Sequence, residues 1–280
     1  NTKQIGECMV IEDVHHRPLL DLRISVTDRC NMRCRYCMPR EHFDKHHEFL
    51  PKEDILRFEE IVCVVQAMIP HGLRKVRLTG GEPLLRRDLH ELIRQLRNCS
   101  SDLDIAITTN GLLLKKQLKK LHEAGLSRVT ISLDALDERT YQSMGDTKAT
   151  PSVVLEAVDA VQRLGLPIKV NTVVKKGVNE DQILPMVKYF GQRDVSVRFI
   201  EFMDVGSTND WNLDHVLPAE AIRSMLTDEY GTLEAKRPDH ASDVAKVYTT
   251  SEGWKIGFIE SITNPFCGDC SRARLSANGS

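Results

Sequence analysis

Residues 20–37 read LDLRISVTDRCNMRCRYC, and they combine an alternating segment with a loop that is rich in cysteine. The first seven residues alternate between apolar and polar side chains, which predicts a β-strand with one buried face. Cysteines follow at positions 30, 34 and 37, so three thiols share one tight loop directly after the strand. In α/β folds, functional residues gather at the carboxyl ends of parallel strands, which makes this loop a candidate metal site.

Five more segments of period two follow along the chain: KVRLT (75–79), DIAITT (104–109), RVTISLD (128–134), IKVNTVV (168–174) and VRFIEFM (197–203). Amphipathic helical segments lie between them, over residues 52–68, 88–98, 115–125 and 151–165. The last two close with Gly125 and Gly165, in the position where glycine ends a helix. Repeated strand–helix units predict parallel strands with right-handed crossovers, in an open doubly wound sheet or a barrel.

Each predicted strand has a polar second face, although a helix follows to cover it. Strands buried on both faces normally read as continuous apolar runs, so this polar face must line a wet cavity. A closed eight-strand barrel, filled by aliphatic layers, does not fit. We therefore predict an α/β protein with a partial (βα)6 barrel of the TIM type, open on one side, that holds a polar ligand. The polar face carries Asp21, Arg23, Ser25, Lys75, Arg77, Thr79, Thr108, Thr130, Ser132, Asp134, Lys169 and Asn171.

The period weakens after about residue 204. GSTNDWNLDH (206–215) is typical of a loop, WKIGFI (254–259) predicts one more strand, and NPFCGDCSRARL (264–275) adds two cysteines and two arginines. We predict three parts: an N-terminal extension over residues 1–19, the barrel over 20–204, and a C-terminal region over 205–280 that covers the opening of the barrel.

Composition narrows the function. The 280 residues carry a formal net charge of −2 at pH 7 and a pI near 6.6, which argues against a protein that wraps nucleic acid or coats an anionic membrane. The longest apolar run, IVCVVQAMI (61–69), is far shorter than the roughly 20 residues that span a bilayer. Eight cysteines in a chain of this size favour reduced thiols over a disulfide scaffold.

The spacing C-x3-C-x2-C leaves the fourth corner of a metal site open. Cubane iron–sulfur clusters are commonly held by four cysteines, so three ligands would leave one iron free to bind a substrate or cofactor. One alternative is structural zinc on this triplet and a distant thiol, although structural zinc usually uses C-x2-C pairs in small modules. A second alternative, that the thiols are simply small buried side chains, suits the isolated cysteines instead: Cys8, Cys63 and Cys99.

CNMRCRYC, with an aromatic residue before its last cysteine, and LTGGEPLLR (78–86) resemble the signature motifs of radical S-adenosylmethionine (SAM) enzymes. The cysteine triplet alone would indicate only that superfamily. More narrowly, seven blocks in order resemble the GTP 3′,8-cyclases of molybdenum cofactor biosynthesis, from about residue 20 to the end of the sequence. The blocks are DLRISVTDRCNMRCRYCMP, VRLTGGEPLLRRDL, TTNG, ISLDA, KVNTVV, RFIEFM and FCGDCSRARLSANG.

The resemblance implies a [4Fe–4S] cluster on the three loop cysteines, with SAM chelated by the open iron. Gly80 and Gly81 would let the backbone approach the methionine part of SAM closely, and Glu82 would lie near its ammonium group. Carried over by position, the cluster ligands are Cys30, Cys34 and Cys37, and the SAM-binding residues are Tyr36, Gly81, Ser132 and Met203.

The same resemblance implies a GTP site without a P-loop, and GGEPLLRR lacks the Lys-Ser/Thr ending of that motif. The charge must then come from side chains, and the planar fork of arginine suits phosphate oxygens. Basic residues repeated on the polar faces of consecutive strands favour such a site, because a buried cation without a partner is costly. The implied GTP contacts are Arg23, Arg77, Thr108, Lys169, Arg272 and Arg274, with Lys75 and Arg198 as further candidates.

CGDCSRAR resembles the second cluster motif of the family. It implies that Cys267 and Cys270 hold another [4Fe–4S] cluster, whose open iron would meet the guanine base. The family places a third cysteine further along the chain, and we expect that ligand to lie beyond Ser280. The alternative is a substitute thiol, which the spacing does not favour, among Cys8, Cys63 and Cys99.

The resemblance implies a lyase that converts GTP to (8S)-3′,8-cyclo-7,8-dihydroguanosine 5′-triphosphate, the first step of molybdenum cofactor (molybdopterin) biosynthesis. Reductive cleavage of SAM would give a 5′-deoxyadenosyl radical that removes the hydrogen at ribose C3′, and the carbon radical would then attack guanine C8. The protein would position two nucleotides and exclude water, so no catalytic side chain is nominated beyond cluster-bound SAM. The ten histidines, several of them in VHHRP and DKHHEF, are expected to be solvated.

The implied partners are GTP, a reducing electron donor of the flavodoxin type, a downstream pyranopterin monophosphate synthase and a second copy of the chain in a homodimer, with no nucleic acid and no membrane. The implied location is the cytoplasm, or the matrix of a mitochondrion or plastid. Two rival hypotheses stay open: another radical SAM enzyme, such as one that modifies peptides, and a zinc-stabilised binding module without activity.

Overall fold

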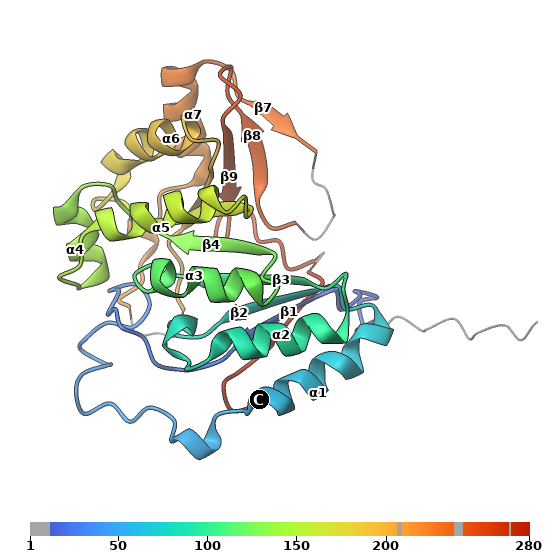
Figure 1. The fold of residues 1–280 in the computed structure, drawn as a ribbon. Helices are drawn as coiled ribbons and strands as arrows, with labels where there is room; N and C mark the ends of the chain where they lie inside the picture. Colours follow the sequence, from blue (N-terminus) through green and yellow to red (C-terminus); the bar gives the residue numbers. More distant parts are fainter. Residues whose placement is uncertain (1–11, 206–208, 238–242, 269) are drawn as a thin grey trace, which may run out of the picture.

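The computed structural model describes residues 12–205, 209–237, 243–268 and 270–280. Within them ten strands form one continuous sheet: β1 Asp21–Ser25, β2 Lys75–Thr79, β3 Asp104–Thr109, β4 Arg128–Ser132, β5 Ile168–Val174, β6 Ser196–Glu201, β7 Glu234–Lys236, β8 Lys246–Thr249, β9 Lys255–Ile259 and β10 Arg272–Leu275. Their order in the sheet is β10-β1-β2-β3-β4-β5-β6-β9-β8-β7. All neighbours from β10 to β9 pair in parallel, and only the hairpin of β9, β8 and β7 is antiparallel (Figure 1).

The helices of the described residues are α1 Phe58–Met68, α2 Leu89–Cys99, α3 Leu114–Glu123, α4 Glu138–Gly145, α5 Pro151–Arg163, α6 Ile183–Gly191 and α7 Ala219–Tyr230, with short 3-10 turns over Lys52–Asp54, Ile69–His71, Pro83–Leu85, Glu180–Gln182 and Leu213–His215. Helices α1, α2, α3 and α5 lie along one face of the sheet (Figure 1). Their apolar residues, such as Leu92 and Val158, are fully buried in the core that they share with the strands. One layer of helices therefore covers the outer face, and the polar face is left for the interior of the barrel.

The six predicted barrel strands are confirmed, and β2, β3 and β5 have the predicted bounds. Burial alternates along β1 and β2 as expected, with Leu22 and Ile24 buried and Arg23 half-buried between them. Three strands are shorter than predicted: β1 spans Asp21–Ser25 instead of 20–26, β4 ends at Ser132, and β6 ends at Glu201. Met203 therefore lies two residues beyond its strand.

The helix predicted over residues 52–68 is wrong in its first part. A 3-10 turn over Lys52–Asp54 comes first, and the α-helix begins only at Phe58. The cause is a tertiary contact, because the Leu56 amide donates a hydrogen bond to the Ala277 carbonyl (2.8 Å) near the C-terminus, which lies beside α1 (Figure 1). This contact holds the chain away from a helical conformation.

The C-terminal strands extend the sheet at both edges. β9 pairs in parallel with β6, whereas β10 pairs in parallel with β1 and sets Arg272 opposite Asp21. The described residues between β9 and β10, 260–268 and 270–271 (called the strap below), must therefore cross the open side of the barrel. Its residues 264–266 line the barrel cavity, as a cover does.

The fold is the predicted one, a partial barrel whose sheet does not close on itself, crossed by a C-terminal segment. The division into three parts stays a prediction: residues 1–11 lie outside the described residues, and β9 and β10 belong to the same sheet as the barrel. In the described part of the chain no helix combines the length and the hydropathy that a bilayer crossing requires.

Candidate active site

A cavity of about 960 Å³ fills the interior of the partial barrel. Cationic side chains enter it from strands that include β10, β1, β2, β4, β5 and β6, because positions two apart on a strand share one face. The register places Arg23 on β1 opposite Arg77 on β2, and Asp21 opposite Lys75 one step earlier. The cations that line the cavity include Arg23, Lys75, Arg77, Arg128, Lys169, Arg198 and Arg272.

The buried cations depress one another's affinity for protons. Burial first, and then the charge of Arg77, lowers the pKa of Arg23 to about 10. Burial and the neighbouring arginines likewise lower the pKa of Arg198 to about 10. The same causes lower the pKa of Lys75 and of Lys169 to about 8. These groups are still cationic at neutral pH, so the cavity favours a polyanion.

Several polar atoms of the barrel are buried and have no hydrogen-bond partner among the described residues. They include three guanidinium nitrogens, a hydroxyl and an amide oxygen: Arg23 Nε, Arg77 Nε, Arg198 Nε, Thr108 Oγ1 and Asn171 Oδ1. Buried polar groups are normally paired, and leaving one unpaired costs about 1–3 kcal/mol. Such a set on one face of a sheet fits a ligand that supplies the missing partners.

Of the seven cations named above, two are ion paired with acids. Lys75 Nζ lies 3.4 Å from Asp21 Oδ2, and Arg128 Nε donates to Asp104 Oδ1 (2.9 Å). Sequence reasoning missed Arg128, although it lies two residues before Thr130 on β4 and therefore on the same polar face of the strand. Extending the alternation to the first residue of the strand would have found it.

The structure does not bring every predicted GTP residue to the cavity lining. Arg272 lines it, and its Nε and Nη2 also donate to Cys270 Sγ (3.3 and 3.2 Å). Arg274 is exposed and is not part of the lining, although it lies on the same strand. Thr108 is also outside the lining, and its hydroxyl is one of the unpaired groups.

A second cavity, of about 400 Å³, lies over the cysteine loop. All three predicted cluster ligands line it, together with Gly80 and Gly81. None of the described cysteines is in a disulfide. Burial raises the pKa of all three loop thiols, in the case of Cys37 to about 11. The thiols would therefore release protons when they bind a metal.

This loop fits a cluster better than a single ion. In the described part of the chain, no three His, Cys, Asp or Glu side chains are arranged to hold one metal ion. The three thiols instead border a shared cavity, as a larger group with several irons requires. The donor set, three unpaired thiols from one loop, fits an iron–sulfur cluster with one open corner.

Gly80 and Gly81 are required by the protein's own backbone. A Cβ on Gly81 would lie 2.3 Å from the Arg29 carbonyl oxygen, and one on Gly80 (φ +151°) would lie 2.4 Å from that of Thr27. The two loops are hydrogen bonded there, since the Gly81 amide donates to Thr27 O (2.9 Å). These glycines therefore seat the cysteine loop, and their predicted contact with SAM stays a prediction.

Glu82 is 1% exposed, and its carboxylate accepts hydrogen bonds from other groups of the protein. Oε1 accepts hydrogen bonds from Thr109 Oγ1 (2.7 Å) and the Leu84 amide (3.1 Å), and Oε2 accepts one from the Asn110 amide (2.8 Å). Burial raises the pKa of Glu82 although these bonds oppose the shift. The carboxylate thus joins the loops after β2 and β3, and a role toward an ammonium group stays a prediction.

Two of the predicted SAM residues, Tyr36 and Met203, are hydrogen bonded to one asparagine that sequence reasoning missed. Asn209 Nδ2 donates to the carbonyls of Tyr36 (3.0 Å) and Met203 (3.1 Å), and Asn209 is 4% exposed. Its Oδ1 is buried with no partner among the described residues. The phenol of Tyr36 reaches Asp134, two residues beyond Ser132 at the end of β4. No local sequence signal marks Asn209, which lies in a loop.

The two strap cysteines lie at the far end of the covering segment. Cys267 is exposed, and its carbonyl accepts a hydrogen bond from Arg17 Nη1 (2.5 Å). Burial would raise the pKa of Cys270, but hydrogen bonds from Arg272 lower it. Of the alternative thiols for a third ligand, Cys8 lies outside the described residues, and the other two sit on outer helices: Cys63 on α1 and Cys99 on α2.

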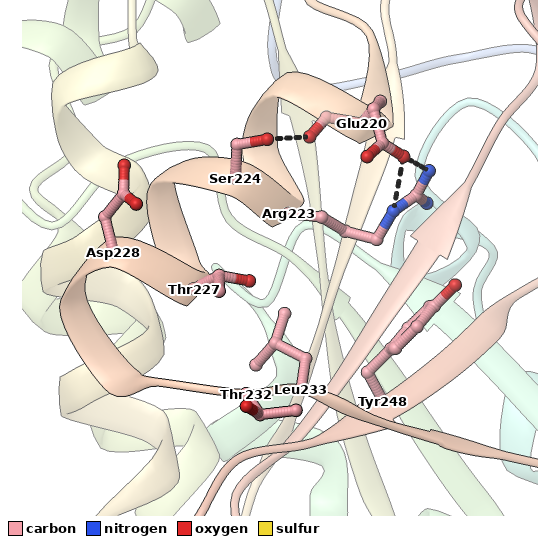
Figure 2. Close-up of a pocket in the computed structure, with 8 residues that line it drawn as sticks. All are labelled: Glu220, Arg223, Ser224, Thr227, Asp228, Thr232, Leu233 and Tyr248. Carbon is pink, nitrogen blue, oxygen red and sulfur yellow. Dashed lines mark hydrogen bonds and ion pairs between the residues drawn. The ribbon is translucent and has the colours of Figure 1, made fainter.

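A third, shallow cavity of about 380 Å³ lies between α7 and β8 (Figure 2). Figure 2 shows Arg223 turned toward Glu220, with which it is ion paired. Arg223 also pairs with Glu260, so its charge is already balanced. The histidines of the two predicted loops are exposed, as expected: His15, His16, His46 and His47. The expectation is wrong for His71, His90 and His215, which are half-buried.

The fold and the cysteine loop define a radical SAM protein. Residues 24–190 match the family model described as Radical SAM superfamily, and the chain belongs to that superfamily. SuiB of Streptococcus suis bound to S-adenosylmethionine superposes with a TM-score of 0.63 at 17% identity, over 77% of this chain and 49% of that one, so the chain spans about half of its length. anSMEcpe with bound AdoMet gives 0.60 at 20% identity, over 75% and 60%. These two likenesses show the fold alone.

Sequence comparison resolves the family further. Residues 195–280 match the model described as Molybdenum Cofactor Synthesis C. GTP 3′,8-cyclases of Staphylococcus carnosus and Staphylococcus saprophyticus are 46% and 47% identical over 270 residues, which cover 96% of this chain and 79% of each relative. The chain belongs to the GTP 3′,8-cyclase family.

Proposed function

We propose that this chain is a radical SAM GTP 3′,8-cyclase, which converts GTP to (8S)-3′,8-cyclo-7,8-dihydroguanosine 5′-triphosphate at the start of molybdenum cofactor biosynthesis. One observation carries the proposal beyond family membership. A cavity lined by buried, unpaired guanidinium groups lies inside the barrel, and the cysteine loop lies at the carboxyl ends of the same strands. A triphosphate matches the first feature, and the donor set of a cluster with an open corner matches the second.

Cys30, Cys34 and Cys37 would hold the first cluster, which when bound supplies the electron that cleaves SAM to methionine and the 5′-deoxyadenosyl radical that takes hydrogen from ribose C3′. Tyr36, Gly81, Ser132 and Met203 would bind SAM. The backbone of Tyr36 and Met203 is already fixed by one amide, that of Asn209. Pre-organisation of this kind lets the protein orient SAM without reordering the loop.

The barrel cations would bind the triphosphate. Arg77 and Arg198 present buried Nε groups that have no partner in the described part of the chain, and Lys169 lies between them on β5. Guanidinium groups bind phosphate oxygens through two parallel hydrogen bonds, which fixes the orientation of the ligand as well as its charge. With the phosphates held, the ribose would face the carboxyl ends of the strands, where the reaction takes place.

The strap would complete the site. We propose that Cys267 and Cys270 hold a second [4Fe–4S] cluster with a third thiol beyond Ser280, and that this cluster offers an open iron to the guanine base. The strap lines the same cavity as the barrel cations, which supports a contact with GTP. The covering segment would also exclude water from radical chemistry.

The rest of the setting follows from the family. We propose a flavodoxin-like protein as electron donor, a pyranopterin monophosphate synthase as the next enzyme, a homodimer, and a location in the cytoplasm or an organelle matrix.

Anaerobic reconstitution with iron and sulfide tests the function. We expect a brown protein with about eight irons per chain when the protein includes the third thiol beyond Ser280, and about four in Cys267→Ala or in Cys30→Ala. Mass spectrometry should find the cyclised nucleotide only when SAM, GTP and a reductant are all present. A colourless protein that binds zinc would contradict the enzyme assignment, and titration with GTP, GMP and a peptide would expose a peptide-modifying enzyme instead.

A further inference from the structure

Glu201, the last residue of β6, is 2% exposed, and its carboxylate joins three segments of the chain. Oε1 accepts hydrogen bonds from the Ala219 amide (3.0 Å) and from Thr263 Oγ1 (2.6 Å). Oε2 accepts hydrogen bonds from the amides of Ile262 and Thr263, both at 2.9 Å. All four donors belong to segments that are distant from Glu201 in the sequence.

These donors lie at two places that matter for the site. Ala219 is the first residue of α7, where free amides and the helix dipole favour a negative charge. Ile262 and Thr263 begin the strap, four residues before Cys267. The carboxylate therefore fixes the point at which the strap leaves the barrel wall, and from which it crosses to β10.

A second acid strengthens this anchor. Glu260 opens the strap, is 4% exposed, and pairs with Arg223 on α7 and Lys246 on β8. Arg223 is the side chain that Figure 2 shows between Glu220 and Tyr248. The far end of the strap is held separately, because the Ser271 carbonyl accepts hydrogen bonds from the Leu20 and Asp21 amides (2.9 and 3.2 Å).

We propose that Glu201 is a positioning residue, which sets the path of the strap so that residues 264–266 and Arg272 line the GTP cavity, with Cys267 and Cys270 next to them in the chain. An apolar residue could fill the same space, but it would not orient two consecutive amides and a hydroxyl of the strap. Glu201 also lies two residues before Met203, so the same strand end serves both the SAM side and the GTP side. The role of the strap in binding GTP rests on the proposed function. The hydrogen bonds between Glu201 and the strap do not depend on it.

The test compares Glu201→Gln with the wild type and with Leu92→Ala, a cavity-forming change in the buried face of α2 that does not touch the strap. Hydrogen exchange of the metal-free protein is measured over residues 261–271 and over the cysteine loop. Affinities for GTP and for SAM are then measured on the reconstituted holoenzyme. Thr263→Val, which keeps the shape and removes one hydrogen bond, serves if Glu201→Gln does not fold.

In Glu201→Gln we expect exchange over 261–271 to rise about tenfold, with the cysteine loop unchanged. The Kd for GTP should rise about tenfold, and that for SAM should change less than about threefold. The proposal is overturned if strap exchange equals that of the wild type, or if GTP and SAM weaken together as in Leu92→Ala. A wild-type protein that does not bind GTP would refute the proposed function, while the exchange comparison would still decide the role of Glu201.

Discussion

The phenol of Tyr36 donates a hydrogen bond to Asp134 Oδ2 across 2.7 Å, which ties the cysteine loop to the carboxyl end of β4. Asp134 Oδ1 accepts a second hydrogen bond from the Val173 amide on β5 (2.9 Å). Asp134 is 7% exposed, so the loop rests on a buried carboxyl group that two strands share. The aromatic residue of the cysteine motif thus has a task within the protein as well as its predicted contact with SAM.

Tyr36→Phe removes the phenol and leaves Asp134 Oδ2 buried without its donor. We expect the free energy of unfolding to fall by about 1–3 kcal/mol, because an orphaned buried acceptor costs that much. Binding of SAM should weaken, whereas the iron content of the loop should not change, since no thiol is altered. Chemical denaturation and SAM titration check both effects.

Tyr230→Phe is the matched control, because the phenol of Tyr230 makes only a long hydrogen bond to the Leu184 carbonyl (3.4 Å) on the far side of the barrel. If this control and Tyr36→Phe lower SAM affinity equally, the link between Tyr36 and Asp134 does not position the loop.

Arg77→Ala and Arg272→Ala each remove one guanidinium group from the barrel cavity. We expect GTP affinity to fall by about 10- to 100-fold in each, the value of a charged hydrogen bond, while reductive cleavage of SAM continues. Isothermal titration and assay of 5′-deoxyadenosine measure the two effects. Arg94→Ala on the exposed face of α2, where Arg94 pairs with Glu91, should leave both unchanged. Unaltered GTP affinity in both cavity variants would contradict a GTP site inside the barrel.

GTP binding should weaken as the pH rises through about 8, because burial and neighbouring cations lower the pKa of Lys75 and Lys169 to about 8. A bound phosphate stabilises the charged ammonium and raises the pKa of the complex above that of the free protein. The affinity for GTP is therefore highest below pH 8. It falls between the lysine pKa values of the free protein and those of the GTP complex, where binding takes up protons.

Titrations in buffers of different ionisation enthalpy measure that proton uptake. Lys75→Arg with Lys169→Arg keeps the charge but should remove most of the pH dependence between pH 7 and pH 9, because arginine does not titrate there. If GTP affinity in this double variant depends on pH as steeply as in the wild type, another group, such as the γ-phosphate, causes the pH dependence.

Gly81→Ala should displace the cysteine loop, because its Cβ would lie 2.3 Å from the Arg29 carbonyl oxygen, a backbone atom that cannot rotate away. We expect a loss of about 1–3 kcal/mol of stability and a lower iron content after reconstitution. Gly165→Ala is the control: it strains a residue at φ +69° but meets no atom within 4 Å, so it should lower stability without affecting iron. Full iron loading in Gly81→Ala would contradict the seating role of this glycine.

Local patterning predicted most of the barrel. Alternation along six strands sufficed to orient Arg23 and Arg77 into the interior, because the side-chain period of a strand is set by its backbone alone. The same rule, extended by one residue, would have included Arg128. The resemblance, and not this rule, nominated Arg274, which shares the parity of Arg272 but lies on the edge strand β10 and is exposed there, so its contact with GTP stays a prediction. A pattern specifies which face a residue occupies, but not how far the cavity extends beneath it.

The amino-acid sequence by itself determined the open α/β barrel, the three thiols after its first strand and the family, since each depends on residues close together in the chain or on motifs in order. Only the tertiary structure decided that Asn209 joins Tyr36 to Met203, that Glu201 anchors the strap, and that β10 pairs with β1. The physical reason is that the hydrogen bonds from Asn209 to Tyr36, from the strap to Glu201 and between β10 and β1 join segments far apart in the sequence. A buried polar group finds its partner by proximity in the folded chain, and no local period records that proximity.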